Sequence, residues 1–329
     1  MAPAVIYALS LACLFWVYRD FNWRQEIPRL LRIHWAWILL AVTCDVAVYV
    51  IQAWRWNLLL LPLARAPLWR SVRAIYIGLF ANEMLPLRSG EAIRCYLQAR
   101  WTRIPFSEAL SSAIIERLID GVWLVIGLAI TSLFVKVPAR VEVGIYILLA
   151  LIAALGGFVA FAVFNKKYAH HVVSQHRWTE QLRYLVEGLH IMAGNAASFF
   201  PACAVSLVYF VLQVVPIYAL VRGYGVGLTV WQAAIVLVVL RLGTIVPGPP
   251  SNVGVFNAFA VLGLRLIGID RQTATGLSGL MFFTITIPLL AGGILALIAT
   301  GVRIQDIHLH ARNAMRNHSS SENRGARQS

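Results

Sequence analysis

The chain has 329 residues, of which 60% are hydrophobic and 13% are charged, and its mean hydropathy is +0.73. This composition excludes an ordinary soluble domain, in which charged residues make up about a quarter of the chain. The formal charge of +14 would indicate nucleic-acid binding in a soluble protein, but the basic residues lie mainly beside apolar runs. There they favour membrane topology and anionic headgroups. We therefore predict an all-α polytopic membrane protein that binds no nucleic acid.

Apolar runs of about 20 residues predict helices that cross a hydrocarbon core about 30 Å thick. The first run has no basic residue ahead of it and no small-residue cleavage pattern after it, which favours a retained helix over a removable signal peptide. Residues 1–303 are predicted to form one membrane domain, and residues 304–329 a basic, disordered cytoplasmic tail. About six full spans are expected near residues 3–18, 34–54, 107–135, 143–164, 199–222 and 275–300.

Two further stretches, residues 71–100 and 229–268, each consist of two apolar arms around a break. The first break is Leu85–Gly90 (LPLRSG) and the second is Pro247–Gly254 (PGPPSNVG). Both predict re-entrant helical hairpins, because irregular backbone at membrane depth is tolerated only where protein buries it or a watery cavity lies beside it. The alternative is that each stretch is two ordinary short spans joined by a Pro-Gly turn at the membrane surface.

The predicted order is two spans, a hairpin and a span, followed by the same order again. Each half crosses three times, so the second half is expected to be inverted relative to the first, as in many transporters with a central site. We found no residue-level similarity between the halves beyond the hairpin breaks, and the inverted repeat is therefore a topological hypothesis.

Basic loops predict the orientation in the membrane. The residues around Lys166–Arg183 and the basic tail belong on the cytoplasmic side, which places both termini there in a plasma (inner) membrane. The same topology puts Arg55 in a cytoplasmic loop, whereas the basic loop Arg19–Arg32 falls outside and disagrees with the rule. The linker His176–Met192 mixes apolar and charged residues in the pattern of an amphipathic helix on the membrane surface.

The densest polar cluster is Asn82–Arg94, between strongly apolar flanks. Ser89 is placed to cap the second arm of the hairpin, and Glu91 then lies in its first turn, where the helix dipole favours an acid. Glu91 and Arg94 are three residues apart and are expected to pair. Arg88, on the break itself, and Arg94 are suited to bind a phosphate or another anionic group.

The next predicted span contains Glu116, Arg117 and Asp120 within an apolar helix. An unpaired charge at this depth costs on the order of 3 kcal/mol or more, so ionisable residues here indicate function. Glu116 and Asp120 share one face, and Arg117 is within reach of Asp120. The alternative is an internal ion pair that locks two helices together.

In the second hairpin, Arg241 precedes the break, Ser251 and Asn252 lie on it, and Asn257 follows. The exposed amides of a helix that begins near Ser251 are suited to accept a phosphate. A simple Pro-Gly turn is the alternative explanation of the same residues.

In order and spacing, these motifs resemble the lysylphosphatidylglycerol synthase transmembrane-region family, also called flippase-like. In its best-known members this region is joined to a cytoplasmic domain that transfers an aminoacyl group to phosphatidylglycerol, and the membrane part moves the product between leaflets. The tail after residue 301 is too short for that domain, so the resemblance implies lipid translocation rather than synthesis. Asn257 departs from the acidic residue of many members. The resemblance rests on Asn82–Pro86, Arg88, Gly90, Glu91, Arg94, Glu116, Arg117, Asp120 and Pro247–Gly254, and Arg55-Trp56 fits the same pattern.

We expect a non-enzymatic lipid flippase without a cofactor, in which arginines hold a headgroup phosphate and acids balance the charge or contact a headgroup amine. No Walker loop is visible, so a gradient or downhill movement would drive it. Two alternatives stay open: a membrane-embedded transferase acting on a polyprenyl or hopanoid-type lipid, and a non-catalytic scaffold that binds envelope biosynthesis enzymes. The predicted substrate-binding residues are Arg88, Glu91, Arg94, Glu116, Arg117, Asp120, Arg241, Ser251, Asn252 and Asn257.

Overall fold

The computed structural model describes residues 2–84, 90–133, 150, 153–154, 156–157, 179–245 and 252–301. Over these residues the chain forms eleven α-helices and no strand, in agreement with the predicted all-α class. The helices are α1 (Ala2–Tyr18), α2 (Trp23–Leu31), α3 (Trp35–Leu60), α4 (Leu68–Met84), α5 (Gly90–Thr102), α6 (Phe106–Ser132), α9 (Thr179–Gly194), α10 (Ala196–Gly223), α11 (Val230–Ile245), α12 (Val255–Leu266) and α13 (Arg271–Thr300).

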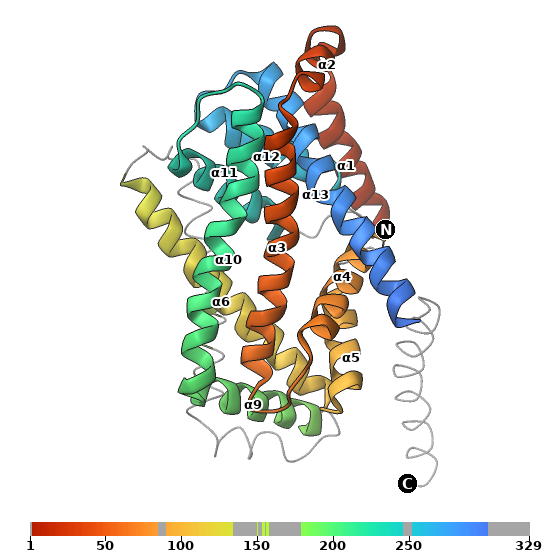
Figure 1. Ribbon diagram of the computed structural model, residues 1–329, viewed down its shortest axis with the longest axis vertical. Coiled ribbons are helices and arrows are strands. Elements are labelled where there is room, and N and C mark those ends of the chain that lie inside the picture. Colours follow the sequence, from red (N-terminus) through yellow and green to blue (C-terminus); the bar gives the residue numbers. More distant parts are fainter. Residues whose placement is uncertain are drawn as a thin grey trace.

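Helices α3 and α10 run side by side along the long axis of the bundle in opposite directions (Figure 1). A Cβ atom added to Gly223, the last residue of α10, would lie 2.7 Å from the Cβ of Trp37 in the first turn of α3. At the other end of α3, Arg55 donates a hydrogen bond to Ser206, in the middle of α10, over 3.3 Å. This pair forms the spine against which both hairpins pack.

Within the described residues, three helices are long and apolar enough to cross a membrane: α3, α10 and α13. Large apolar side chains on their outer faces are exposed, including Leu39, Phe200 and Phe283, as expected of surfaces that contact lipid rather than water. Helix α1 has only 17 residues, and α6 carries Glu116, Arg117 and Asp120 inside it. Most of the span predicted at 143–164 lies outside the described residues.

Helices α4 and α5 form an antiparallel hairpin at the end of the bundle where α3 ends and α6 begins (Figure 1). Near the outer end of α5, Gln98 donates a hydrogen bond to Ser71, near the outer end of α4, over 3.0 Å. Asn57 of α3 accepts a hydrogen bond from the same Ser71 over 2.6 Å. Both arms therefore have their outer ends beside the end of α3, and their inner ends point into the bundle.

Helices α11 and α12 form the second hairpin at the opposite end, where α10 ends and α13 begins (Figure 1). The predicted breaks fall between Met84 and Gly90 and between Ile245 and Val255, where the described helices end and restart. The residues of the two turns themselves, 85–89 and 246–251, lie outside the described residues. The two hairpins thus approach the centre of the bundle from opposite ends.

Two shorter helices occupy the ends of the bundle. Helix α9, expected from the amphipathic linker, lies across one end and packs its Gly188 against Ser111 of α6 (Figure 1). Helix α2 lies at the other end, where Glu26 is buried and accepts a hydrogen bond from Tyr224. The prediction of a plain basic loop over Arg19–Arg32 was therefore wrong. Helix α2 escaped detection because it has only nine residues, is polar on average and contains Pro28.

Gly254, at the N-terminus of α12, has a φ of +86°, and a Cβ atom there would collide with the carbonyl oxygen of Ser10 on α1. Gly225 has almost the same φ, +85°, with no atom within 4 Å of an added Cβ. The change Gly225→Ala carries only the conformational cost of about 1–2 kcal/mol. We expect Gly254→Ala to lower the midpoint of thermal unfolding in detergent by clearly more than Gly225→Ala does, because the added Cβ also displaces α1. Equal shifts for the two variants would contradict a tight contact between α1 and α12.

Candidate functional site

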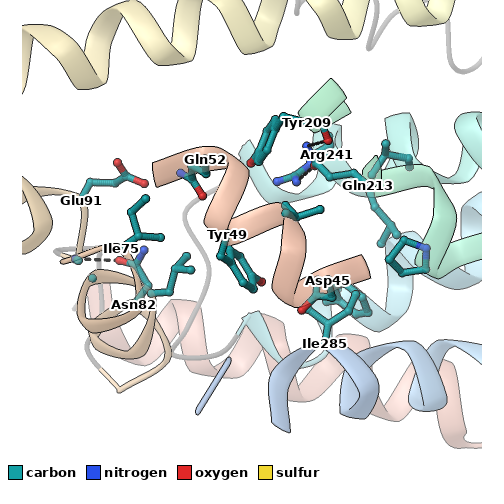
Figure 2. Close-up of a pocket in the computed structure, with 18 of the residues that line it drawn as sticks. Asp45, Tyr49, Gln52, Ile75, Asn82, Glu91, Tyr209, Gln213, Arg241 and Ile285 are labelled. Atoms are coloured by element: carbon teal, nitrogen blue, oxygen red, sulfur yellow. Dashed lines mark hydrogen bonds between the residues drawn. The ribbon is translucent and has the colours of Figure 1, made fainter. Parts of the chain in front are cut away.

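A cavity of roughly 200 Å³ lies between the two hairpins and the α3–α10 pair. Figure 2 shows side chains from both halves of the chain converging on it. Its wall is apolar at Val48, Leu237 and Phe256, among others, and polar elsewhere. The polar lining residues are Asp45, Tyr49, Gln52, Asn82, Glu91, Arg94, Arg117, Tyr209, Gln213 and Arg241.

A network of arginines and acids lies along one side of this cavity. Arg55, whose side chain is fully buried, donates to Glu116 over 3.0 Å and also to Asp120. Arg94 lies 2.8 Å from Glu116 and 2.8 Å from Glu91. Each of the two buried arginines thus holds two carboxylates, and Glu116 bridges them.

Arg117 closes the network on the side of the cavity. Its guanidinium contacts Glu91 and lies 3.9 Å from Asp120. The network therefore contains three arginines and three carboxylates, and its formal charges balance. Arg117 is the most accessible member, with 49% of its side chain exposed, whereas Arg55 is not exposed at all.

Aromatic rings line the buried arginines. The guanidinium carbon of Arg55 lies 4.6 Å from the ring centre of Tyr209, and that of Arg94 lies 4.7 Å from the ring of Trp56. Trp56 is itself held by a hydrogen bond of 2.7 Å from its indole nitrogen to Ser112. Such stacking favours an arginine cation in a desolvated position, and the paired carboxylates supply the rest of its solvation.

Close packing of α4 on α5 brings Arg94 into the network. A Cβ atom at Gly78 would lie 2.7 Å from the carbonyl oxygen of Gly90 and 2.9 Å from the Cβ of Arg94, so only glycine allows this approach. The side-chain oxygen of Asn82 accepts a hydrogen bond of 2.8 Å from the backbone N–H of Gly90. Asn82 thereby satisfies an N-terminal amide of α5. Ser89, the expected cap, lies outside the described residues.

A second polar group lies where α10 and α11 meet α3 at the cavity (Figure 2). Arg241 of α11 donates a hydrogen bond to Gln213 of α10. Asp45 of α3 is 7% exposed, and its Oδ2 atom has no hydrogen-bond partner in the structure. Tyr49 lies one turn further along the same helix and also lines the cavity.

The structure brings together six of the predicted site residues, all at or beside one cavity. Asn257 is 3% exposed and accepts a hydrogen bond from Tyr18 of α1 over 3.4 Å. Asn252 adopts a left-handed backbone conformation just before α12, and neither asparagine is among the cavity-lining residues. Arg88 and Ser251 lie outside the described residues. The six predicted site residues that lie at or beside the cavity are Glu91, Arg94, Glu116, Arg117, Asp120 and Arg241.

Sequence reasoning missed several polar residues of this site. The predicted position of Arg55 in a cytoplasmic loop is wrong, because α3 continues to Leu60 and buries Arg55 against α6. Asp45, Gln52 and Gln213 stand inside apolar runs that we interpreted as plain spans. A lone acid or amide in such a run was the available signal, because a polar side chain at this depth needs a partner or a cavity.

No group of three or more histidines, cysteines or acids suited to a metal ion occurs in the described part of the chain. The described side chains at the cavity supply guanidinium groups, carboxylates, amides and phenols. Guanidinium groups bind phosphate with two parallel hydrogen bonds, and carboxylates bind amines or protons.

Residues 4–293 match the family model for the lysylphosphatidylglycerol synthase TM region. The matched residues include both hairpins, the whole charged network and every residue that lines the cavity. No curated protein and no solved structure shows a significant match to the chain.

Proposed function

We propose, because the chain belongs to the lysylphosphatidylglycerol synthase TM region family, that it is a flippase that moves an anionic lipid between the leaflets of a membrane. The observation that carries this proposal is the balanced network of charges beside a cavity in an apolar bundle. A cavity of roughly 200 Å³ suits a headgroup rather than a whole lipid, whose acyl chains would stay in the surrounding bilayer.

The network offers a headgroup phosphate a way to bind without creating an unpaired buried charge. Arg117 is half-exposed and shares Glu91 with Arg94. A phosphate that replaces Glu91 as the partner of Arg117 would gain a two-pronged guanidinium contact, while Glu91 keeps its contact with Arg94. An amine on the headgroup would find its partner in Glu91.

The arrangement of the hairpins supports alternating access to this site. We interpret α4–α5 and α11–α12 as re-entrant hairpins of an inverted repeat, because they approach one cavity from opposite ends of the bundle. In such repeats, movement of one half against the other opens the site to either side in turn. We assign both termini to the cytoplasm and the protein to the plasma membrane, with α9 on the cytoplasmic surface.

Purified protein in liposomes that contain trace phosphatidylglycerol with a fluorescent acyl chain tests the proposal. Dithionite destroys the label in the outer leaflet, so complete loss of fluorescence reports exchange between leaflets, and protein-free liposomes give the background. We expect exchange with no new lipid species in the extract. A modified lipid would instead indicate the transferase on a polyprenyl or hopanoid-type lipid, once such lipids are included. If neither exchange nor a modified lipid is observed, the remaining hypothesis is a non-catalytic scaffold that binds envelope biosynthesis enzymes.

The change Arg117→Gln is expected to slow phosphatidylglycerol exchange by about tenfold or more, since a charge-assisted hydrogen bond contributes roughly 1.5–3 kcal/mol. The protein should still fold, because Arg117 is half-exposed and Glu91 retains Arg94. The matched control is Arg222→Gln at the end of α10, whose guanidinium contacts only Tyr218 among the contacts described for it. A wild-type exchange rate for a well-folded Arg117→Gln protein would contradict the proposed headgroup site.

A further inference from the structure

Helix α2 carries an apolar stripe that the rest of the described chain leaves largely uncovered. Trp23, Ile27 and Leu31 follow one another at intervals of four residues, so they lie along one face of the helix. Their exposed fractions are 54%, 44% and 79%. A continuous apolar patch of this kind is unfavourable in water and indicates a surface that contacts a partner or a membrane.

Contacts with the bundle fix the orientation of α2. Glu26 is buried and accepts a hydrogen bond from Tyr224, the residue that follows α10. Glu26 also pairs with Arg29 over 3.1 Å. Just before the helix, the backbone N–H of Asn22 donates a hydrogen bond to Gln272 of α13 over 3.0 Å. The stripe is therefore turned away from α10 and α13 and held there.

Exposed arginines accompany the apolar stripe. Arg24, Arg29 and Arg32 are all exposed, and Arg29 is the one that pairs with Glu26. Among the described residues, no carboxylate lies within ion-pair distance of Arg24 or Arg32. An apolar stripe next to arginines without a carboxylate partner is typical of a helix that lies in the membrane surface. In such a helix the apolar side enters the boundary between headgroups and acyl chains, and the basic side binds anionic headgroups.

The position of α2 places this stripe beside a surface that contacts lipid. Trp35, the first residue of α3, follows Leu31 by four residues and is exposed, as is Leu39 one turn further along α3. Helix α3 is long and apolar enough to cross a membrane. Figure 1 shows α2 at the end of the bundle where α3 begins. The membrane surface is thus the neighbour that fits both the apolar stripe and the arginines.

We propose that α2 is a membrane-surface helix that binds anionic phospholipids, a role separate from the lipid exchange proposed above. Trp23, Ile27 and Leu31 enter the boundary between headgroups and acyl chains, while Arg24 and Arg32 bind headgroup phosphates. Each arginine near such a surface favours an anionic over a zwitterionic lipid by up to about fivefold. This role also accounts for the basic charge of a segment that disagrees with the positive-inside rule.

Spin labels on two faces of α2 test its position. A nitroxide is attached to p-acetylphenylalanine that replaces either Ile27, on the stripe, or the exposed Gln25, on the opposite face, in liposomes of phosphatidylcholine and phosphatidylglycerol. The label at Ile27 should collide mainly with oxygen, which concentrates in lipid, and the label at Gln25 mainly with a water-soluble nickel chelate. Equal access of the chelate to both labels would overturn the proposal. Shielding of the Ile27 label from both reagents would also overturn it, in favour of a protein partner.

A fluorophore attached in the same way at Ile27 tests the preference for anionic lipid. Quenching by phosphatidylglycerol with a nitroxide on its acyl chain is compared with quenching by phosphatidylcholine that carries the same group. We expect phosphatidylglycerol to be enriched several-fold around wild-type α2. The double change Arg24→Gln with Arg32→Gln should remove the enrichment, whereas Arg70→Gln with Arg73→Gln, two exposed arginines on α4, should keep it. Equal quenching by the two lipids in the wild type would overturn the proposal, and neither measurement requires exchange between leaflets.

Discussion

Replacing Arg55 by methionine is expected to lower the free energy of unfolding by about 3 to 5 kcal/mol, the usual cost of removing one partner from a buried ion pair. Arg55 is fully buried and binds both Glu116 and Asp120. Without Arg55, the ion pair described for Asp120 is the one with Arg117, 3.9 Å away. The carboxylates of Glu116 and Asp120 then repel each other in a desolvated position. Thermal unfolding in detergent, followed by tryptophan fluorescence, measures the loss, with Arg19→Met as the exposed control expected to change stability by no more than about 0.5 kcal/mol.

A double variant separates the charge imbalance from simple loss of packing. In Arg55→Met with Glu116→Met, Arg94 keeps Glu91 and Arg117 keeps Asp120, so the remaining charges balance. We expect the double variant to be more stable than the sum of the single losses predicts, by up to about 3 kcal/mol. Strict additivity would mean that Arg55 does not contribute to stability through its pairing with Glu116.

The helices were predictable because hydropathy is a local property of the chain. The predicted starts and ends of α10 agree with the structure to within a few residues. The span predicted for α3 ended too early, at residue 54, because a charged residue such as Arg55 after an apolar run indicates the start of a loop. The burial of Arg55 depends on acids that lie 61 and 65 residues away, and no window along the sequence contains both partners. Helix α2 was missed for the opposite reason, because it is short and polar on average.

For the site, the sequence predicted contacts between residues close in the chain but not the meeting of distant ones. Pairing of Glu91 with Arg94 followed from their spacing of three residues, and the structure confirms it. Gathering of these residues with Arg241 at one cavity depends on the meeting of two hairpins that are far apart in the chain. Asp45 carried a signal, a lone acid in an apolar run, but only the structure shows that it lines the cavity.

Convergence of the two halves explains why the cavity has two different polar sides. The first hairpin contributes Glu91 and Arg94 to a network whose charges are already balanced. The second contributes Arg241, which donates a hydrogen bond to Gln213 at the cavity. In the proposed flippase, the balanced network is the side that recognises the headgroup.

The second large effect is expected from Gly90→Ala, because the added methyl group would collide with the carbonyl oxygen of Gly78 and lie 2.6 Å from the side-chain oxygen of Asn82. The arms α4 and α5 must separate to admit it, at a cost of about 1–3 kcal/mol. Separation also pulls Arg94 away from Glu116, which now lies 2.8 Å from it. We therefore expect a lower thermal midpoint together with loss of phosphatidylglycerol exchange by more than about tenfold.

Two other glycines give a graded control for this prediction. Gly194, the last residue of α9, has no atom within 4 Å of an added Cβ, so Gly194→Ala should be neutral or slightly stabilising. Gly78→Ala should fall between the two, since its Cβ would lie 2.7 Å from the carbonyl oxygen of Gly90. Losses in the order Gly90, Gly78, Gly194 would tie exchange to the spacing of the hairpin arms. Normal exchange by Gly90→Ala would show that the approach of α5 to α4 is not what holds Arg94 in the network.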